Sequence, residues 1–227
     1  MDSNKKIIYH GSEHIISKPD SNYGNYSNDY GRGFYCTENM ELAKEWACKK
    51  GNNGFANVYE FDATDMKICN LNSSEYNILN WLALLTRYRS YWQEKSIAKQ
   101  AKDYLQENYL IDIKDFDVIV GYRADDSYFS FAQDFIMGTI SLQKLSVAMR
   151  LGKLGEQIVL KSQKAFDNLR FYESEIALAD EYYVKKANRD LEARIAYHDT
   201  KNQSDYMDDI FILDIIRGRV KEDDLRL

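Results

Sequence analysis

Four short segments carry residues that could bind a flat, polar ligand. His10 to Ser12 ends a short apolar run, and Gly31 to Tyr35 places two aromatic residues directly after a glycine turn. Trp46 follows eleven residues after Tyr35, and Gln157 lies in a later apolar run. An imidazole forms hydrogen bonds, and an aromatic side chain offers a face for stacking. Together these residue types suit a site that stacks a planar ring and orients its polar groups.

Each segment taken alone also has a structural explanation. A histidine at a strand end is often a structural hydrogen-bonding residue, and Gly31 to Tyr35 could be a turn that enters a strand. Trp46 on a helix face could belong to the core. Asp125 and Asp126 could cap a helix or lie in a loop, although paired carboxylates can also bind a hard cation. The functional interpretation therefore depends on the order and spacing of all the segments together.

Length and charge bound the possible functions. At 227 residues the chain suits one domain, or one domain with an extension. Its formal net charge of -6 disfavours nucleic-acid binding through bulk charge, because an acidic surface repels a phosphate backbone. A nucleotide-sized ligand is compatible with that charge.

Cysteine usage and hydropathy indicate the compartment. Cys36, Cys48 and Cys69 are an odd number without CxxC spacing, which argues against a disulfide framework and against a zinc site. We therefore expect no metal site and a cytoplasmic location. The N-terminus has no signal-peptide core, and no apolar run approaches the roughly 18 residues of a membrane span. We expect no membrane partner.

Apolar runs and periodicity predict the elements that position these residues. Strands are predicted at residues 5–9, 33–36, 55–61, 116–121, 157–161 and 168–172. Helices are predicted at about 40–49, over 74–107 as one or two helices, at 129–137, at 141–151, and from 175 onward. Thr37 or Asn39 can cap the first helix, and Ser141 can cap the helix that follows it. Helices inserted between non-adjacent strands favour an α+β fold over a doubly wound sheet.

The motifs resemble those of a known superfamily. The chain lacks the GxGxxG and Walker loops, so a nucleotide must be held in another way. Tyr9 to Ser12 and Gly31 to Thr37 resemble the first two motifs of the ADP-ribosyltransferase superfamily of the diphtheria-toxin and poly(ADP-ribose) polymerase type. Glu156 to Leu160 resembles the strand that bears the catalytic glutamate of that superfamily. In the alignment we prefer, Gln157 takes the glutamate's place, which makes the chain a His-Tyr-Gln variant.

The resemblance implies a role for each motif residue. His10 would hold the nicotinamide-side ribose of NAD, and the backbone of Gly11 would take the carboxamide. Tyr35 and Trp46 would flank nicotinamide, and Gln157 would orient the ribose or the acceptor. Ser12 and Gly33 complete the expected NAD-binding set. Ala43 replaces a serine of the polymerases, which removes one expected hydrogen bond to the carboxamide.

Gln157 affects the expected rate. Breaking the nicotinamide–ribose bond develops oxocarbenium character on the ribose, and a carboxylate would stabilise that charge. Gln157 supplies hydrogen bonds without charge, and its neighbour Glu156 must point to the opposite face of the strand. We therefore expect slow turnover, and we expect Gln157→Glu to raise NAD hydrolysis.

The closest overall resemblance is to a bacterial family of unknown function within that superfamily. It covers about Lys5 to Phe171 and includes the stretch from Asp117 to Asp126. It implies an ADP-ribosyltransferase-like domain at residues 1–174, with a split β-sheet core and a helical insertion near 74–108. Residues 175–227 would form an accessory helical extension, because every matched motif ends before them.

The implied function is NAD-dependent mono-ADP-ribosylation. NAD would be the substrate and a macromolecule of unknown identity the acceptor. The family context suggests a bacterial or phage toxin or effector with a possible antitoxin partner. Two alternatives remain open. One is a non-catalytic NAD-binding or protein-interaction module, and the other is an RNA 2'-phosphotransferase-like enzyme, which is disfavoured because only Arg32 lies near the motifs.

Overall fold

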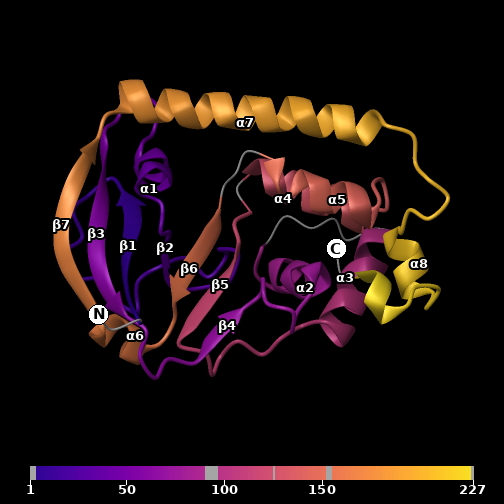
Figure 1. The fold of residues 1–227 in the computed structure, drawn as a ribbon, viewed down its shortest axis with the longest axis horizontal. Coiled ribbons are helices and arrows are strands. Elements are labelled where there is room, and N and C mark those ends of the chain that lie inside the picture. Colours follow the sequence, from indigo (N-terminus) through magenta and orange to yellow (C-terminus); the bar gives the residue numbers. More distant parts are fainter. Residues whose placement is uncertain (1–3, 90–96, 125, 152–154, 226–227) are drawn as a thin grey trace.

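The chain folds into mixed α+β structure with two sheets, as the sequence predicts. The computed structural model describes residues 4–89, 97–124, 126–151 and 155–225. The strands are β1 (Lys5–Ser12), β2 (Phe34–Cys36), β3 (Gly54–Asp62), β4 (Ile68–Asn70), β5 (Val118–Tyr122), β6 (Glu156–Leu160) and β7 (Leu169–Ala177). One sheet has the order β1-β3-β7 and the other β2-β6-β5-β4 (Figure 1). All neighbours pair antiparallel except β4 and β5, which are parallel.

The two sheets meet where β1 lies beside β2. Tyr9 and Thr37 exchange both backbone hydrogen bonds, with N–O distances of 2.8 and 2.9 Å. The two sheets are separate, and this isolated bridge joins them. It also brings His10 on β1 next to Tyr35 on β2, so the first two motifs become neighbours.

Helices cover both sheets. They are α1 (Met40–Ala47), α2 (Ile78–Tyr88), α3 (Ile97–Asn108), α4 (Asp126–Ile136), α5 (Leu142–Ala148), α6 (Gln163–Asp167), α7 (Ala179–Asn202) and α8 (Ile212–Ile216), with a 3₁₀ turn at Glu222–Leu225. Helix α1 packs on β1 and β3, whereas α2 to α5 enclose the main core beside the second sheet (Figure 1). Asn39 caps α1 and Ser141 caps α5, as predicted.

Helix α7 connects the two parts of the molecule. It runs from the first sheet across the top of the view in Figure 1 and contacts α1, α4 and α5. Near its C-terminal end, the ring of Tyr197 stacks on Phe131 of α4 at a centroid distance of 3.8 Å. Ile212 and Ile215 of α8 are buried in the same main core. Residues after 175 therefore contribute to the packing of the elements that precede them.

The structure corrects several sequence-based boundaries. The strand predicted to end at 172 continues to Ala177, because it pairs with β3 as far as Gly54, and the helix predicted from 175 begins at Ala179. Strand β4 and helix α6 were not predicted, since three and five residues are too short to show a period. The insertion forms two helices, α2 and α3. Asp125 and the side chain of Asp126 lie outside the described residues. In the described part of the chain, no helix combines the length and the hydropathy that a membrane span requires.

Candidate functional site

A cleft of about 1030 Å³ lies between the two sheets and α7. The elements that line it are β1, the loop from 13 to 33, β2, α1, β6 and α7, together with the segment after β5, Arg89 at the end of α2 and Tyr128 of α4. Ligand pockets usually measure roughly 300–1,000 Å³, so this cleft is large enough for a dinucleotide-sized molecule. Every residue that the sequence singled out for the site lines it: His10, Gly11, Ser12, Gly33, Tyr35, Trp46 and Gln157.

His10 is held by the strand bridge. Its Nδ1 lies 2.7 Å from the backbone oxygen of Tyr35, so Nδ1 must carry the proton and donate. Its ring stacks on Phe34 at a centroid distance of 4.2 Å. Burial lowers the pKa of His10, and the hydrogen bond to Tyr35 opposes this effect. In the neutral ring Nε2 is an acceptor, so His10 offers an acceptor to a ligand hydroxyl.

Gly11 and Ser12 shape the entrance to the loop. A Cβ on Gly11 would lie 2.0 Å from the backbone oxygen of Ala43, so only glycine lets β1 pack this closely on α1. The Ser12 hydroxyl donates to the His14 carbonyl and accepts from Nδ2 of Asn57 at 3.1 Å. Asn57 is fully buried and also donates to the His10 and His14 carbonyls. The sequence did not point to Asn57, because nothing local marks an asparagine that organises a distant loop.

Tyr35 anchors the loop that precedes it. Its hydroxyl donates to the Gly31 carbonyl at 2.7 Å and accepts from the Tyr30 backbone N–H at 3.0 Å. Nζ of Lys161 donates to the carbonyl of Tyr30 at 2.6 Å. A Cβ on Gly33 would lie 2.6 Å from Cγ1 of Val159, so this glycine allows the loop to pack on β6. The Tyr35 ring therefore lines the cleft while its hydroxyl is used to fix the loop.

Gln157 faces the cleft, and Glu156 does not. Gln157 is 4% exposed, and its Nε2 donates to Oδ2 of Asp29 at 3.1 Å. Glu156 is exposed, and its Oε1 accepts from Nδ2 of Asn72 at 2.6 Å. The alternation of side chains along β6 produces this arrangement. Gln157 is thus the residue of β6 that lines the cleft.

Asp29 is a carboxylate in the cleft that the sequence analysis missed. It is 5% exposed, and its Oδ2 also accepts from the Ala124 backbone N–H at 2.8 Å. Its Oδ1 lies 3.4 Å from Nε of Arg89. Burial raises the pKa of Asp29, while Arg89, Ala124 and Gln157 oppose that shift. The one feature of the sequence that could have pointed to Asp29 is its position in the loop, just before the glycine turn at Gly31.

Trp46 presents a stacking face that is covered by a cation. The guanidinium carbon of Arg123 lies 4.3 Å from the centroid of the Trp46 ring. Nε1 of Trp46 is buried and has no hydrogen-bond partner within the described part of the chain. The ring expected to stack on nicotinamide therefore stacks on a planar cation in this structure, which is the chemistry of a cation–π contact.

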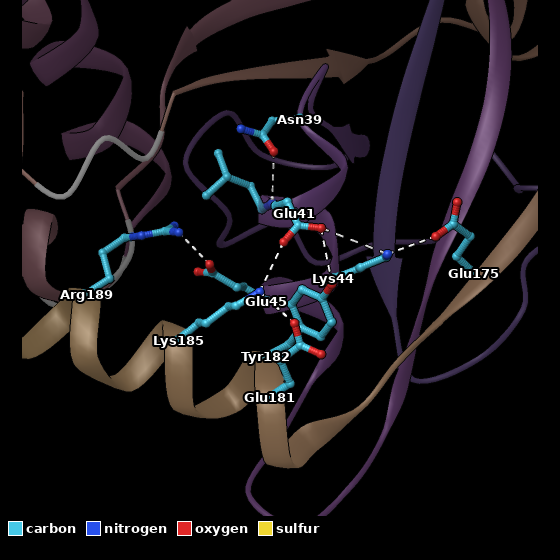
Figure 2. A network of polar contacts seen from close by, with 10 residues as sticks. Asn39, Glu41, Lys44, Glu45, Glu175, Glu181, Tyr182, Lys185 and Arg189 are labelled. Carbon is cyan, nitrogen blue, oxygen red and sulfur yellow. Dashed lines mark hydrogen bonds and ion pairs between the residues drawn. The ribbon is translucent and has the colours of Figure 1, made fainter.

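Charged residues from α7 and from the segment after β5 also line the cleft, and we call them the charged wall: Arg123, Lys186, Arg189, Asp190 and Arg194. Arg189 of α7 donates to Glu45 of α1, which is 2% exposed (Figure 2). Burial raises the pKa of Glu45, and Arg189 opposes the shift. Arg194 pairs with Asp190 along the helix, at 2.9 Å from Nε to Oδ2.

Apart from Trp46, the site residues predicted from the sequence form what we call the motif wall: His10, Gly11, Ser12, Gly33, Tyr35 and Gln157. The sequence predicted this wall and missed the charged one. Within the described part of the chain four arginines line the cleft when Arg89 is included, whereas the sequence shows only Arg32 near the motifs. These arginines come from α7 and from segments between the motifs, and only the tertiary fold brings them together.

Comparison with known proteins gives a family and no activity. A family model described as a protein of unknown function (DUF3990) matches residues 6–171. The match spans the strands of the motif wall but not α7. Among curated proteins and among solved structures, nothing matches the chain. The family match covers more than half of the chain, and the protein therefore belongs to the DUF3990 family.

Proposed function

We propose that this chain is an NAD-dependent mono-ADP-ribosyltransferase that releases nicotinamide and transfers ADP-ribose to a macromolecular acceptor. One observation carries the proposal. Seven residues that were selected from the sequence line a single cleft of about 1030 Å³. They come from three separate motif segments and from the helix that follows the second of these segments. Residues that only packed the core would have no reason to converge on one open site.

The motif wall has the groups that the reaction needs to orient its substrate. In the proposed step, the bond from ribose C1′ to nicotinamide N1 breaks, its electron pair leaves with nicotinamide, and positive charge develops on the ribose. Nε2 of His10 would accept a hydrogen bond from a ribose hydroxyl, and the Tyr35 ring would pack against nicotinamide. Both side chains are fixed by backbone hydrogen bonds at 2.7 Å, so little ordering is required when the substrate binds.

The charged wall suits the other half of the substrate. A dinucleotide carries a negatively charged diphosphate, and guanidinium groups bind phosphate oxygens well. Arg189 and Arg194 reach the cleft from α7 while paired with carboxylates. The pair of Arg194 with Asp190 is exposed, so a diphosphate could compete with Asp190 for that guanidinium, whereas the pair of Arg189 with Glu45 is buried.

The experiment is label transfer from NAD. The full chain is incubated with NAD labelled in the adenylate part and with a bacterial lysate, and macromolecular label and free nicotinamide are both counted. The proposal expects both to exceed the values for heat-inactivated protein. Release of nicotinamide without any transfer would identify an NAD hydrolase, and a failure of both would contradict the proposal.

A second candidate is a non-catalytic NAD-binding module. It is supported by the neutral side chain of Gln157 and by Arg123, which covers the Trp46 ring. Titration calorimetry together with the nicotinamide assay separates the two candidates, because a binding module would bind NAD and release no nicotinamide.

The RNA 2'-phosphotransferase-like alternative is favoured by the four arginines that line the cleft. Three of them, Arg89, Arg189 and Arg194, are paired with carboxylates, which weakens the attraction for a phosphate. Removal of phosphate from an RNA that carries a 2′-phosphate, in the presence of NAD, would support this alternative over the transferase.

A further inference from the structure

Asp29 and Gln157 form a buried carboxylate–amide pair inside the cleft. We propose that Asp29 is the carboxylate that contacts the substrate at this site and that Gln157 is the residue that positions it. The inference rests on the proposed function, because it assigns a role within the same reaction.

The position of Asp29 is fixed by several elements. Its Oδ2 accepts from Gln157 of β6 and from the backbone of Ala124, at 3.1 and 2.8 Å. The next residue, Tyr30, is fully buried and donates through its hydroxyl to the Tyr122 carbonyl at 2.6 Å. Tyr35 and Lys161 hold the backbone of the same loop. A carboxylate that is fixed in this way does not need to be ordered when a ligand arrives.

One oxygen of Asp29 remains available. Both hydrogen bonds go to Oδ2, and no described residue donates a hydrogen bond to Oδ1. Nε of Arg89, at 3.4 Å, is close enough for an ion pair but is itself buried without a hydrogen-bond partner among the described residues. Nη2 of Arg89 is held by the Ala124 carbonyl at 2.8 Å. Asp29 lines the cleft, so a ligand bound there can donate a hydrogen bond to the open acceptor positions of Oδ1.

The chemistry of the proposed reaction requires such a group. When the bond from C1′ to nicotinamide N1 breaks, the electron pair leaves with nicotinamide and C1′ becomes electron-deficient. A nearby carboxylate stabilises that charge. The acceptor then forms its bond to C1′ and loses a proton, which Oδ1 of Asp29 accepts and later releases to solvent. Gln157 cannot do this itself, because a neutral amide carries no charge and is not a base.

This role reverses the expectation for Gln157→Glu. A glutamate at 157 would place a second carboxylate within hydrogen-bond distance of Asp29, and one of the two would have to stay protonated. We therefore expect Gln157→Glu to lower the rate of nicotinamide release about tenfold instead of raising it. The double variant Asp29→Asn with Gln157→Glu restores one carboxylate and one amide with their positions exchanged.

The test measures nicotinamide release and NAD affinity for the full chain and four variants. They are Asp29→Asn, Gln157→Glu, the double variant and Asp65→Asn. Asp65 is a matched control, because it is exposed outside the cleft and its positive φ of 59° is tolerated by asparagine. We expect Asp29→Asn to lower kcat at least 100-fold with NAD affinity changed less than threefold. We expect the double variant to recover at least tenfold over Asp29→Asn, and Asp65→Asn to match the wild type.

Each failure has a distinct meaning. If the wild type releases no nicotinamide, the proposed function is overturned and the inference with it. If the wild type is active and Asp29→Asn retains a third or more of its kcat, the inference alone is overturned. If Asp29→Asn does not fold, a folded double variant decides, since recovery of activity supports the role and inactivity overturns it. If neither variant folds, Asp29 is a structural residue and the inference is overturned.

Discussion

The two walls of the cleft differ in how their polar groups are satisfied. On the motif wall, His10 and Tyr35 are bound to backbone carbonyls, and Gln157 is bound to a buried carboxylate. On the charged wall, Arg194 is bound to the exposed carboxylate of Asp190, which a ligand anion could replace, whereas Arg189 is bound to the buried carboxylate of Glu45. On the proposed function, the motif wall would orient the ribose and nicotinamide, and the charged wall would attract the negatively charged diphosphate.

The walls also differ in their relation to the family. The motif wall lies within residues 6–171, whereas α7 lies outside that match. The cleft is therefore lined partly by residues within the family match and partly by residues of a helix outside it.

The largest effect is expected when the charged wall is removed with its helix. A chain ended at Ala177 keeps all of β7 but loses α7 and α8, which bury Tyr197, Ile212 and Ile215 in the main core. We expect this fragment to lose its cooperative thermal transition, measured by circular dichroism. A soluble, cooperatively folding fragment that binds NAD would show instead that residues 175–227 are the accessory extension expected from sequence.

A single substitution tests how the charged wall is attached. Arg189→Ala leaves Glu45 buried without its partner, whereas Arg189 itself is 26% exposed. Breaking a buried pair from one side is strongly destabilising, and we expect the free energy of unfolding to fall by about 3 kcal/mol in urea titrations. Arg194→Ala is the matched control on the same helix, because its pair with Asp190 is exposed and should contribute about 0.5 kcal/mol or less. Equal effects for the two variants would contradict the account of this attachment.

On the motif wall, His10→Ala removes the acceptor at Nε2 and the link to the Tyr35 carbonyl. We expect nicotinamide release to fall about 100-fold, comparable to the loss of one preorganised polar contact to a reacting group. His198→Ala is the control, since His198 is exposed near the C-terminal end of α7 and does not line the cleft. Wild-type rates in His10→Ala would remove this residue from the site.

The smallest effect is expected at Trp46, between the two walls. Aromatic stacking contributes roughly 0.5–1.5 kcal/mol beyond area burial, so Trp46→Ala should weaken NAD binding about threefold to tenfold. Trp46→Phe keeps an aromatic face and should lose less than Trp46→Ala. Calorimetric titration measures both, and an unchanged affinity in folded Trp46→Ala would assign Trp46 to packing against Arg123 and the core.

Local patterns were enough to predict most of the motif wall. Residue types and periodicity predict the strands β1, β2 and β6 and the helix that Asn39 caps. Because side chains alternate along a strand, the sequence could also state that only one of Glu156 and Gln157 would enter the site. Which of the two it is depends on how β6 pairs with β2 and β5, and this required the structure.

The residues that were missed depend on distant contacts. Asp29 lies in a loop without periodicity, and its importance comes from Gln157, 128 positions away. Arg189 reaches the cleft because α7 docks on α1, and Glu45 looks like an ordinary surface acid until that contact is known. Strand β7 extends beyond its predicted end because β3 offers it a longer partner. Sequence reasoning recovered what neighbours along the chain determine and missed what the tertiary fold brings together.

The most direct test of the account is a single-turnover measurement of nicotinamide release, with the full chain in excess over NAD. In this regime slow product release and a missing acceptor do not hide the chemical step. The account predicts release above the rate in buffer alone, reduced about 100-fold in His10→Ala and unchanged in His198→Ala. Release no faster than in buffer, from a folded chain that calorimetry shows to bind NAD, would contradict the transferase assignment and leave a binding module.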